Sequence, residues 1–303
     1  MSGHSTRLTR ERAIATRPGN LHYGWVIMMT VMAVVFGSVA LGRHGYAVIL
    51  PTMKDALGLS YTQSGSLATA NFVGYLLCAA VGGVVAARYG TRWLVTFGLL
   101  LVGLGLFATG LARNFGMAVA GRVLVGVATG LSNVPALGLL SSWFGPRQRG
   151  AATGVAVSGS GLGILLLGMT LPRVIEACSW RCAWFMLAAG ALGVGVVAAL
   201  LLRNHPEEMG LQPLGGPVEA SQSRPGPWYK LLWEPTLWHL ASVYFLCGLS
   251  YIVYVTFFTT YLVREVGLSS VAAGRLWAVT GAVSIGAGLL WGFLSDRLGR
   301  RLA

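Results

Sequence analysis

Residues Gly292 to Arg301 read G-F-L-S-D-R-L-G-R-R, and this stretch decides how the rest of the chain is interpreted. Residues Gly83 to Arg92 are an imperfect copy, G-V-V-A-A-R-Y-G-T-R, in which Ala87 stands where the later copy has Asp296. In both copies a glycine ends an apolar run, and an arginine, a second glycine and a further arginine follow. The copies begin 209 residues apart, at positions 83 and 292, which is too far for a small solenoid repeat and fits a duplicated half-protein.

The composition is that of a chain embedded in lipid. Hydrophobic residues make up 55% of it and charged residues 10%, whereas soluble domains carry about 25% charged residues. Glycine, at 43 of 303 residues, lets helix backbones approach closely in a membrane bundle. A net charge of +13 would indicate a nucleic-acid partner in a soluble protein. Here the arginines lie mainly in short loops between apolar spans. We therefore expect the chain to lie in a lipid bilayer and to bind no nucleic acid.

Eight apolar stretches follow one another along the chain, each about 20 residues or longer, which suffices to cross roughly 30 Å of hydrocarbon. Backbone in contact with lipid must satisfy its own hydrogen bonds, so all eight are predicted to be helical. The predicted spans are Tyr23–Leu50, Tyr61–Ala87, Trp93–Ala112, Phe115–Ser142, Ala151–Val174, Trp180–Leu202, Thr236–Val263 and Val271–Ser295.

The spans divide into two groups. Residues 1–21 are polar and basic and are interpreted as a cytoplasmic N-terminal arm. Residues 22–202 are interpreted as a first half with six spans. Residues 236–303 are interpreted as the start of a second half, with two spans and the second copy of the repeated stretch. Between them, residues 203–235 contain six prolines and four glutamates and are interpreted as a cytoplasmic linker.

The repeated stretch resembles the signature loop of the major facilitator superfamily, G-x-L-x-D-R-x-G-R-[RK], which lies after the second helix and again after the eighth. The resemblance implies an all-α membrane protein with the major facilitator fold, here a complete six-helix first half plus two helices of the second half. It implies alternating access, in which two halves rock about a central site. The implied cytoplasmic gating residues are Gly83, Arg88, Gly90, Arg92, Gly292, Asp296, Arg297, Gly299, Arg300 and Arg301.

Positive charge sets the expected orientation. With the N-terminus inside, the cytoplasmic segments hold fourteen lysine and arginine residues and the other side holds seven, with Arg122 inside a span. We therefore expect a multi-pass protein of the cell (inner or plasma) membrane with a cytoplasmic N-terminus and both signature loops inside.

Two arginines lie within predicted spans, each roughly 10 Å from the outer end. Arg43 either reaches the interface with its long side chain or anchors an anionic substrate in the central cavity. Arg122 begins a pattern, Arg122, Gly126 and Gly130, that resembles the family's fourth-helix motif. It either bonds to backbone carbonyl groups and holds helices together, or handles substrate or a proton.

The nine acidic residues all lie away from the middle of a span. The accessible interior is therefore predicted to be electropositive, which favours an anionic cargo and leaves no carboxylate to carry a proton. His44, beside Arg43, could carry one or could be a polar residue near an interface. Five further polar residues within spans either line a path or bond between helices; these are Asn71, Asn133, Ser158, Tyr251 and Tyr254.

The sequence contains no paired CxxC and no HExxH motif, so no metal site is expected. A transporter is expected to be neither an enzyme nor dependent on another cofactor. Cys178 and Cys182 could be bridged in an oxidising compartment, but two buried thiols are the expected state. The oligomeric state expected is a monomer.

The branch is suggested by His22–Trp25 (HYGW), by W-F-G-P-R-Q-R-G from Trp143 and by Arg203–Pro213, which resemble monocarboxylate transporters and oxalate:formate antiporters. Arg43 occupies the place of a substrate-facing lysine in monocarboxylate transporters. Ser284 and Gly288 replace an acidic residue and an arginine of that branch. The function predicted is secondary active transport of a small organic anion, first of all a monocarboxylate, by alternating access, with a drug or other small-molecule exporter or a non-transporting sensor or scaffold as alternatives. A substrate panel in proteoliposomes separates the three.

The family has twelve helices, and the chain reaches Ala303 two residues after the second signature copy. The resemblance therefore predicts a fragment of a gene product of roughly 400 residues, which inserts into the membrane but does not transport alone. It also predicts that Gly281, Gly288 and Gly292 face absent neighbours. Reading the coding sequence past Ala303 for four more spans tests this expectation.

Overall fold

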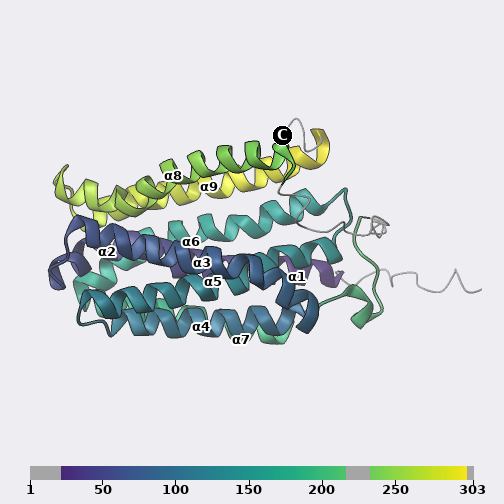
Figure 1. Cartoon of the computed structure of the whole chain (residues 1–303), viewed down its shortest axis with the longest axis horizontal. Coiled ribbons are helices and arrows are strands. Elements are labelled where there is room, and N and C mark those ends of the chain that lie inside the picture. The colour runs from purple at the N-terminus through teal and green to yellow at the C-terminus, as the bar shows by residue number, and fades with distance from the viewer. Residues whose placement is uncertain (1–21, 216–232, 299–303) are drawn as a thin grey trace, which may run out of the picture.

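The computed structural model describes residues 22–215 and 233–298. Long helices run side by side along one direction, joined by short turns at the two ends of the bundle (Figure 1). The order is α1 (Tyr23–Val35), the π-helical segment η1 (Phe36–His44), α2 (Gly45–Ala56), α3 (Tyr61–Tyr89), α4 (Thr91–Gly110), α5 (Phe115–Trp143), α6 (Arg149–Ala177), α7 (Trp180–Leu201), the 3₁₀ turn η2 (Pro206–Met209), α8 (Pro235–Arg264) and α9 (Ser270–Leu298).

The described residues hold eight apolar helical spans when α3 is counted as one. Seven are long and apolar enough to cross a membrane, and α3 is bent by 43° between Tyr61–Ala79 and Val81–Tyr89. The eight helices predicted from the apolar stretches are therefore confirmed. The first is longer than predicted, since α1, η1 and α2 form a continuous span from Tyr23 to Ala56. A helix that is already nucleated adds further residues readily, so it continues past the apolar run to Lys54 and Asp55.

Side-chain caps and one glycine set several helix ends. At the start of α3, Ser60 and Gln63 each accept the other's backbone N–H in a capping box. The side chains of Asn114 and Ser179 each accept one backbone N–H, of Met117 and Cys182, and cap α5 and α7. Gly90 joins α3 to α4 with a φ of +90°, a backbone conformation that only glycine adopts without strain.

The helices α1 to α7, together with η1, form what we call the first bundle, and α8 and α9 form a C-terminal helix pair on one side of it (Figure 1). The helix α6 lies between the two. Gly159 and Gly163 on α6 meet α1 and η1, where an added Cβ would approach Met32 and Ala40. The opposite side of α6 faces α9.

The contact between α6 and α9 is made by glycines on both helices. Gly154, Gly161 and Gly168 of α6 face Gly288, Gly281 and Gly274 of α9, an antiparallel match that repeats every seventh residue. A Cβ on Gly281 would lie 2.3 Å from the Leu165 nitrogen, so the two backbones touch directly. The expectation that Gly281, Gly288 and Gly292 face absent neighbours is wrong. All three pack on α6, because two antiparallel helices can come this close only where the residues between them carry no side chain.

The predicted linker begins with a segment bound to one end of the first bundle. Trp143 donates its indole N–H to the Arg203 carbonyl at 3.1 Å, and backbone bonds join Leu214 to Trp143 and Gly145. Tyr23 donates its hydroxyl to the Leu201 carbonyl at 2.8 Å. Residues up to Gly215 are therefore part of the folded unit.

Cys178 and Cys182 form a disulfide. The expectation of two free thiols is corrected here. The two residues flank the turn between α6 and α7, where Ser179 begins the new helix, and this places the two thiols close together.

Candidate functional site

The centre of the first span is a π-helical segment, η1, whose carbonyl groups are bound by side chains of α5. Arg122 donates Nη1–H to the Gly42 carbonyl at 2.8 Å, and Thr129 donates its hydroxyl to the Ser38 carbonyl at 3.1 Å. Side chains that bond into a helix ladder in this way widen or bend it. Such wide turns are frequent at functional sites, and this one carries Arg43 and His44 at its end.

Arg43 is a cation with no described acceptor for two of its nitrogens. Its Nε and Nη2 atoms are buried and make no hydrogen bond within the described residues. The guanidinium lies over two rings of α3, 4.2 Å from the centre of Phe72 and 4.9 Å from that of Tyr75. It also interacts electrostatically with Tyr251 of α8. A cation–π contact stabilises the charge by about 0.5–2 kcal/mol but leaves the N–H donors free for an anion.

Arg122 is tied into the protein. It is 1% exposed, donates to Gly42, and lies 4.9 Å from the ring centre of Tyr46 and 5.7 Å from that of Trp184. Its own carbonyl accepts the amide N–H of Asn71 at 3.1 Å. These bonds join α5 to η1 and to α3, which is the arrangement of the helix-holding alternative for Arg122. Asn71 makes the inter-helix bond that was one of its two predicted roles.

His44 connects the first bundle with the C-terminal helix pair. It is 1% exposed, and its Nε2 lies 3.2 Å from the Ser160 hydroxyl of α6. Its ring centre lies 6.4 Å from that of Trp277 of α9. The Nδ1 atom is buried without a hydrogen-bond partner in the described structure.

The remaining polar candidates lie on α5 and α8. Tyr254 packs on Phe258 and Trp277, with its hydroxyl 3.4 Å from that of Thr280. Tyr251 is about half exposed and lies within electrostatic range of Arg43. Asn133 is half-buried, and its side-chain oxygen Oδ1 has no hydrogen-bond partner among the described residues. Tyr251 therefore interacts electrostatically with Arg43, whereas nothing in the described contacts joins Asn133 to either residue.

The first signature loop is bound to the start of the predicted linker. Arg92 donates Nε–H and Nη2–H to the Ala199 carbonyl at 3.0 and 2.6 Å. Its backbone N–H goes to the Asn204 side chain at 2.9 Å, so Asn204 caps α4 from a distant part of the chain. Arg88 is exposed and lies over Tyr89. A Cβ on Gly83 would meet nothing within 4 Å.

The second signature loop is bound to α6. The two oxygens of Asp296 accept the backbone N–H groups of Gly150 and Ala151 at 2.8 and 2.7 Å. A carboxylate at a helix N-terminus is favoured by the helix dipole. Arg297 lies 4.2 Å from the ring centre of Phe293. Gly299, Arg300 and Arg301, which were also predicted to gate, lie outside the described residues.

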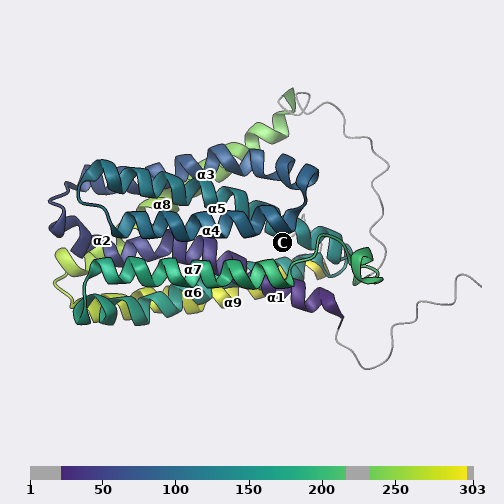
Figure 2. The same cartoon turned by 90° about the horizontal axis from the view of Figure 1, so that it is seen from below.

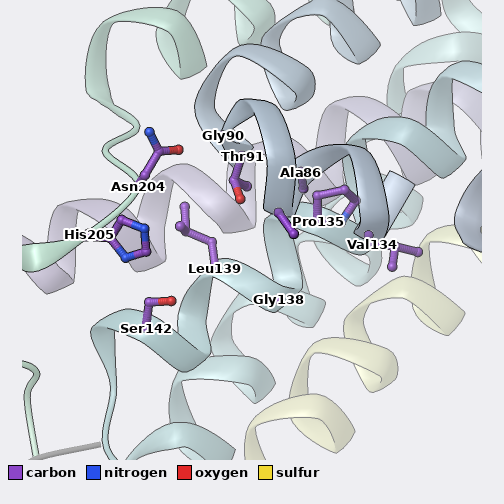
Figure 3. Close-up of a pocket in the computed structure, with 12 residues that line it drawn as sticks. Ala86, Gly90, Thr91, Val134, Pro135, Gly138, Leu139, Ser142, Asn204 and His205 are labelled. Carbon is purple, nitrogen blue, oxygen red and sulfur yellow. The ribbon is translucent and has the colours of Figure 1, made fainter. Parts of the chain in front are cut away.

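A hollow of about 580 Å³ lies beside the first signature loop, between the ends of α3, α4 and α5 and the start of the predicted linker (Figure 3). Asn204 and His205 approach it from the linker side, and Leu139 and Ser142 come from α5 (Figure 3). Gly83, Ala87 and Gly90 of the signature loop also line it. No arginine, lysine or carboxylate is in its described lining, so this hollow does not match an anion site, and Arg43 is not part of it.

At the opposite end of the molecule, an ion pair joins Asp55 of α2 to Arg264 of α8. The first bundle and the C-terminal helix pair are therefore linked at both ends, by Asp296 at one and by Asp55 at the other. The views in Figures 1 and 2 place these two ends at opposite limits of the long axis. Arg43 and His44 lie on the span between them.

Eight long apolar helices, a glycine-lined contact between two helix groups and a signature loop that caps a helix across that contact define a membrane transporter fold. The chain belongs to the Major Facilitator Superfamily, whose family model matches residues 27–303.

Individual relatives agree with this assignment. The chain is 27% identical over 267 residues to a hexuronate transporter of Bacillus subtilis, covering 87% of this chain and 62% of the relative. It is 30% identical over 196 residues to monocarboxylate transporter 11 of Mus musculus, covering 64% of this chain and 43% of the relative. The chain thus spans less than two thirds of the length of either.

The fold also matches a solved structure, a bacterial homologue of the human lysosomal transporter Spinster in an inward-facing, unoccupied conformation. The TM-score is 0.72 at 19% sequence identity, with 93% of this chain and 64% of that chain covered. At this identity the match describes the fold alone.

Several site residues were missed by sequence reasoning. Phe72 and Tyr75 hold Arg43, and Ser160 and Trp277 contact His44. A signal existed for Tyr75, which lies one helical turn after Asn71 and thus on the same face. The position of Trp277 depends on how α9 packs, which no local pattern records.

Proposed function

We propose that this chain forms the anion-binding part of a secondary active transporter that carries a small organic anion by alternating access. A monocarboxylate is the first candidate and a hexuronate the second, since relatives of both kinds are similar to this chain. Arg43 is the proposed anchor. Tyr251 is proposed to contribute from the C-terminal helix pair, and the N-terminus is proposed to be cytoplasmic.

The buried, unpartnered guanidinium of Arg43 is the observation that carries the proposal. A buried charge without a hydrogen-bond partner is costly, so its persistence in a packed bundle is best explained by a ligand that completes it. Arginine offers a planar two-pronged donor that matches a carboxylate. The rings of Phe72 and Tyr75 hold this donor in place and leave Nε and Nη2 free.

The contacts at the two ends supply the gates that alternating access requires. Asp296 binds the first turn of α6 at one end, and Asp55 pairs with Arg264 at the other. Opening one end breaks one of these contacts while the other keeps the helix groups together. Arg43, between the ends, then faces one side of the membrane at a time.

Two measurements test this proposal. Binding of lactate, D-glucuronate and the lipophilic cation tetraphenylphosphonium to the purified chain is measured by calorimetry. Uptake of the same compounds is measured in proteoliposomes that hold the protein. We expect binding and uptake of at least one anion and neither for the cation, because Asp and Glu on the described helices lie near helix ends.

The matched variants are Arg43→Gln, Arg43→Lys and Arg113→Gln. Charged hydrogen bonds of about 1.5–3 kcal/mol correspond to roughly a ten- to hundred-fold loss of anion affinity in Arg43→Gln. Arg43→Lys retains part of the affinity through its point charge. Arg113 is exposed in the turn before α5, so its variant is the control. Unchanged anion binding by Arg43→Gln would remove Arg43 from the site.

A further inference from the structure

A groove of about 430 Å³ lies between α6 and α9, at the end of the bundle where Asp296 caps α6. Its volume falls in the range of about 300–1,000 Å³ that is usual for small-molecule sites. The proposed function leaves this groove without a role. Glycines of both helices line it, together with the side chains of Arg149, Thr153, Val157 and Trp291.

Arg149 supplies the charge of the groove. Its Nη2–H group donates to the Ser141 carbonyl at 3.1 Å, which fixes the side chain near the start of α6. Its Nε atom is buried without a described hydrogen-bond partner, and no ion pair of Arg149 is described. A guanidinium carries five N–H donors in a planar fork, so Arg149 has donors left for a carboxylate.

The carboxylate of Asp296 is not part of the described lining of the groove. Both its oxygens accept backbone N–H groups of α6, from Gly150 and Ala151. Trp291 and Asp296 are five residues apart, which is about 140° around an α-helix, so they lie on different sides of α9. The described lining thus contains one arginine and no carboxylate, and this charge is complementary to an anion.

The groove and the η1 segment lie along the same two helix faces. On α6, Thr153 in the groove and Ser160 are seven residues apart and therefore share a face. On α9, Trp291 in the groove and Trp277 are fourteen residues apart, about four helical turns, and also share a face. Ser160 and Trp277 both contact His44 of η1. The distance along α9 from Trp291 to Trp277 is about 21 Å, so the two faces connect the groove with the centre of the first span.

We propose that the groove between α6 and α9 is a second anion site, in which Arg149 holds the transported carboxylate between the water at this end of the bundle and Arg43. This inference rests on the proposed function. The carboxylate binds the free N–H groups of Arg149, and its carbon skeleton lies along Val157 and Trp291, which are 42% and 54% exposed. Because this site is open to water, it is weaker than the site at Arg43. A path with more than one moderate binding site lets an ion enter readily and still leave.

Equilibrium dialysis of radiolabelled lactate and D-glucuronate against the purified whole chain tests the proposal, because it counts the anions bound by each chain. We expect two classes of binding for the transported anion, a tighter one at Arg43 and a weaker one at Arg149. Raising the ionic strength from about 0.01 M to about 0.15 M shortens the screening length from about 30 Å to about 8 Å. The weaker class should therefore lose more affinity with salt than the tighter class, because the donors of Arg43 are buried.

Substitutions assign the two classes. Arg149→Gln should weaken the weaker class by about ten- to a hundred-fold, the effect of losing a charged hydrogen bond, and Arg43→Gln acts on the tighter class instead. Arg149→Lys should keep part of the weaker class through its point charge and is the second variant should Arg149→Gln fail to fold. Arg147→Gln should change neither class and is the matched control, since Arg147 is exposed in the turn before α6 and lies outside the described lining.

The two sites can fail separately. A single class of binding in the unmodified chain, removed by Arg43→Gln, would refute the groove site and leave the proposed function standing. Equal losses in Arg149→Gln and Arg147→Gln would also refute the groove site, because they indicate attraction by the general positive charge of this end. A single class that only Arg149→Gln removes would support the groove site and contradict the anchoring role of Arg43. Absence of binding by both anions would contradict the groove site and the proposed function together.

Discussion

The carboxylate of Asp296 accepts a hydrogen bond of 2.8 Å from the backbone N–H of Gly150, so α9 caps α6 from outside. The residue at the N-cap position of α6, Gln148, makes no side-chain cap bond of its own. A second bond of 2.7 Å joins the other carboxylate oxygen to Ala151. One side chain thus completes a helix of the first bundle and holds the C-terminal helix pair against it.

Asp296→Ala is the first prediction. It removes two charge-assisted bonds that lie partly buried, so we expect a loss of stability of about 1.5–3 kcal/mol, measured by denaturant unfolding in detergent. Transport of an anion should fall with it. Ala87→Asp, the corresponding position of the first signature copy, should have a smaller effect, because no helix N-terminus is described against it. Equal and small effects of the two substitutions would show that neither loop limits the transport cycle.

The glycine contact between α6 and α9 gives the second prediction. Gly281→Ala places a methyl group 2.3 Å from the Leu165 nitrogen, and such overpacking costs about 1–3 kcal/mol. Gly286→Ala on the same helix meets nothing within 4 Å and should be neutral, or stabilising by up to about 1 kcal/mol through helix propensity. The check is the difference between the two unfolding free energies. A Gly281→Ala chain as stable as Gly286→Ala would contradict the close contact.

The third prediction concerns the ion pair between Asp55 and Arg264. Both side chains are about half exposed, so Asp55→Asn should change stability by less than about 1 kcal/mol. It should, however, raise the reaction rate of a cysteine at Thr260, one turn before Arg264 and 2% exposed, with a membrane-impermeant maleimide. The background for this experiment replaces Cys78 and Cys247, the free cysteines. Glu265→Asn is the control, since this acid neighbours Arg264 without a described ion pair. Equal rates in the two variants would show that the pair does not restrain the end of the bundle at which Asp55 and Arg264 lie.

The fourth prediction separates the two membrane arginines. Arg122→Gln removes the donor to the Gly42 carbonyl and two cation–π contacts, so we expect a loss of about 1–3 kcal/mol of stability. Arg43→Gln removes two cation–π contacts but also a charge whose buried Nε and Nη2 have no described acceptor, so its stability should fall less than that of Arg122→Gln while its anion binding weakens. Chemical denaturation of both variants, side by side, provides the measurement. The opposite ranking of the two stabilities would reverse the roles given to these residues.

The apolar pattern predicted the helices well because each span must satisfy its backbone within itself. It could not predict the π-helical segment Phe36–His44, since the cause lies in Arg122 and Thr129, which follow much later in the chain. The sequence also placed Arg43 and Arg122 at the same depth in their spans, so it could not predict that they have different roles. Only the tertiary position of the Gly42 carbonyl distinguishes the arginine that is tied down from the one that is free.

The signature stretch predicted that Asp296 has a role at the inner end but not its partner, because Gly150 is 146 residues away. The sequence correctly predicted that the glycines of α9 pack against another helix, but it predicted the wrong helix. Small residues indicate that a helix approaches closely, and they do not identify which helix it is. The bridge between Cys178 and Cys182 depends on the turn that Ser179 makes, which the spacing alone leaves open.

The glycine contact between α6 and α9 extends from Gly150 and Gly292 at one end to Gly168 and Gly274 at the other, about 27 Å at the rise of an α-helix. An attachment of that length does not depend on the peptide chain that joins the two parts. A polypeptide cut between Gly215 and Trp233 should therefore stay assembled in the membrane, and two separately synthesised pieces should find each other there. Covalent continuity would then matter for delivering both pieces to one membrane in equal numbers, more than for holding them together afterwards.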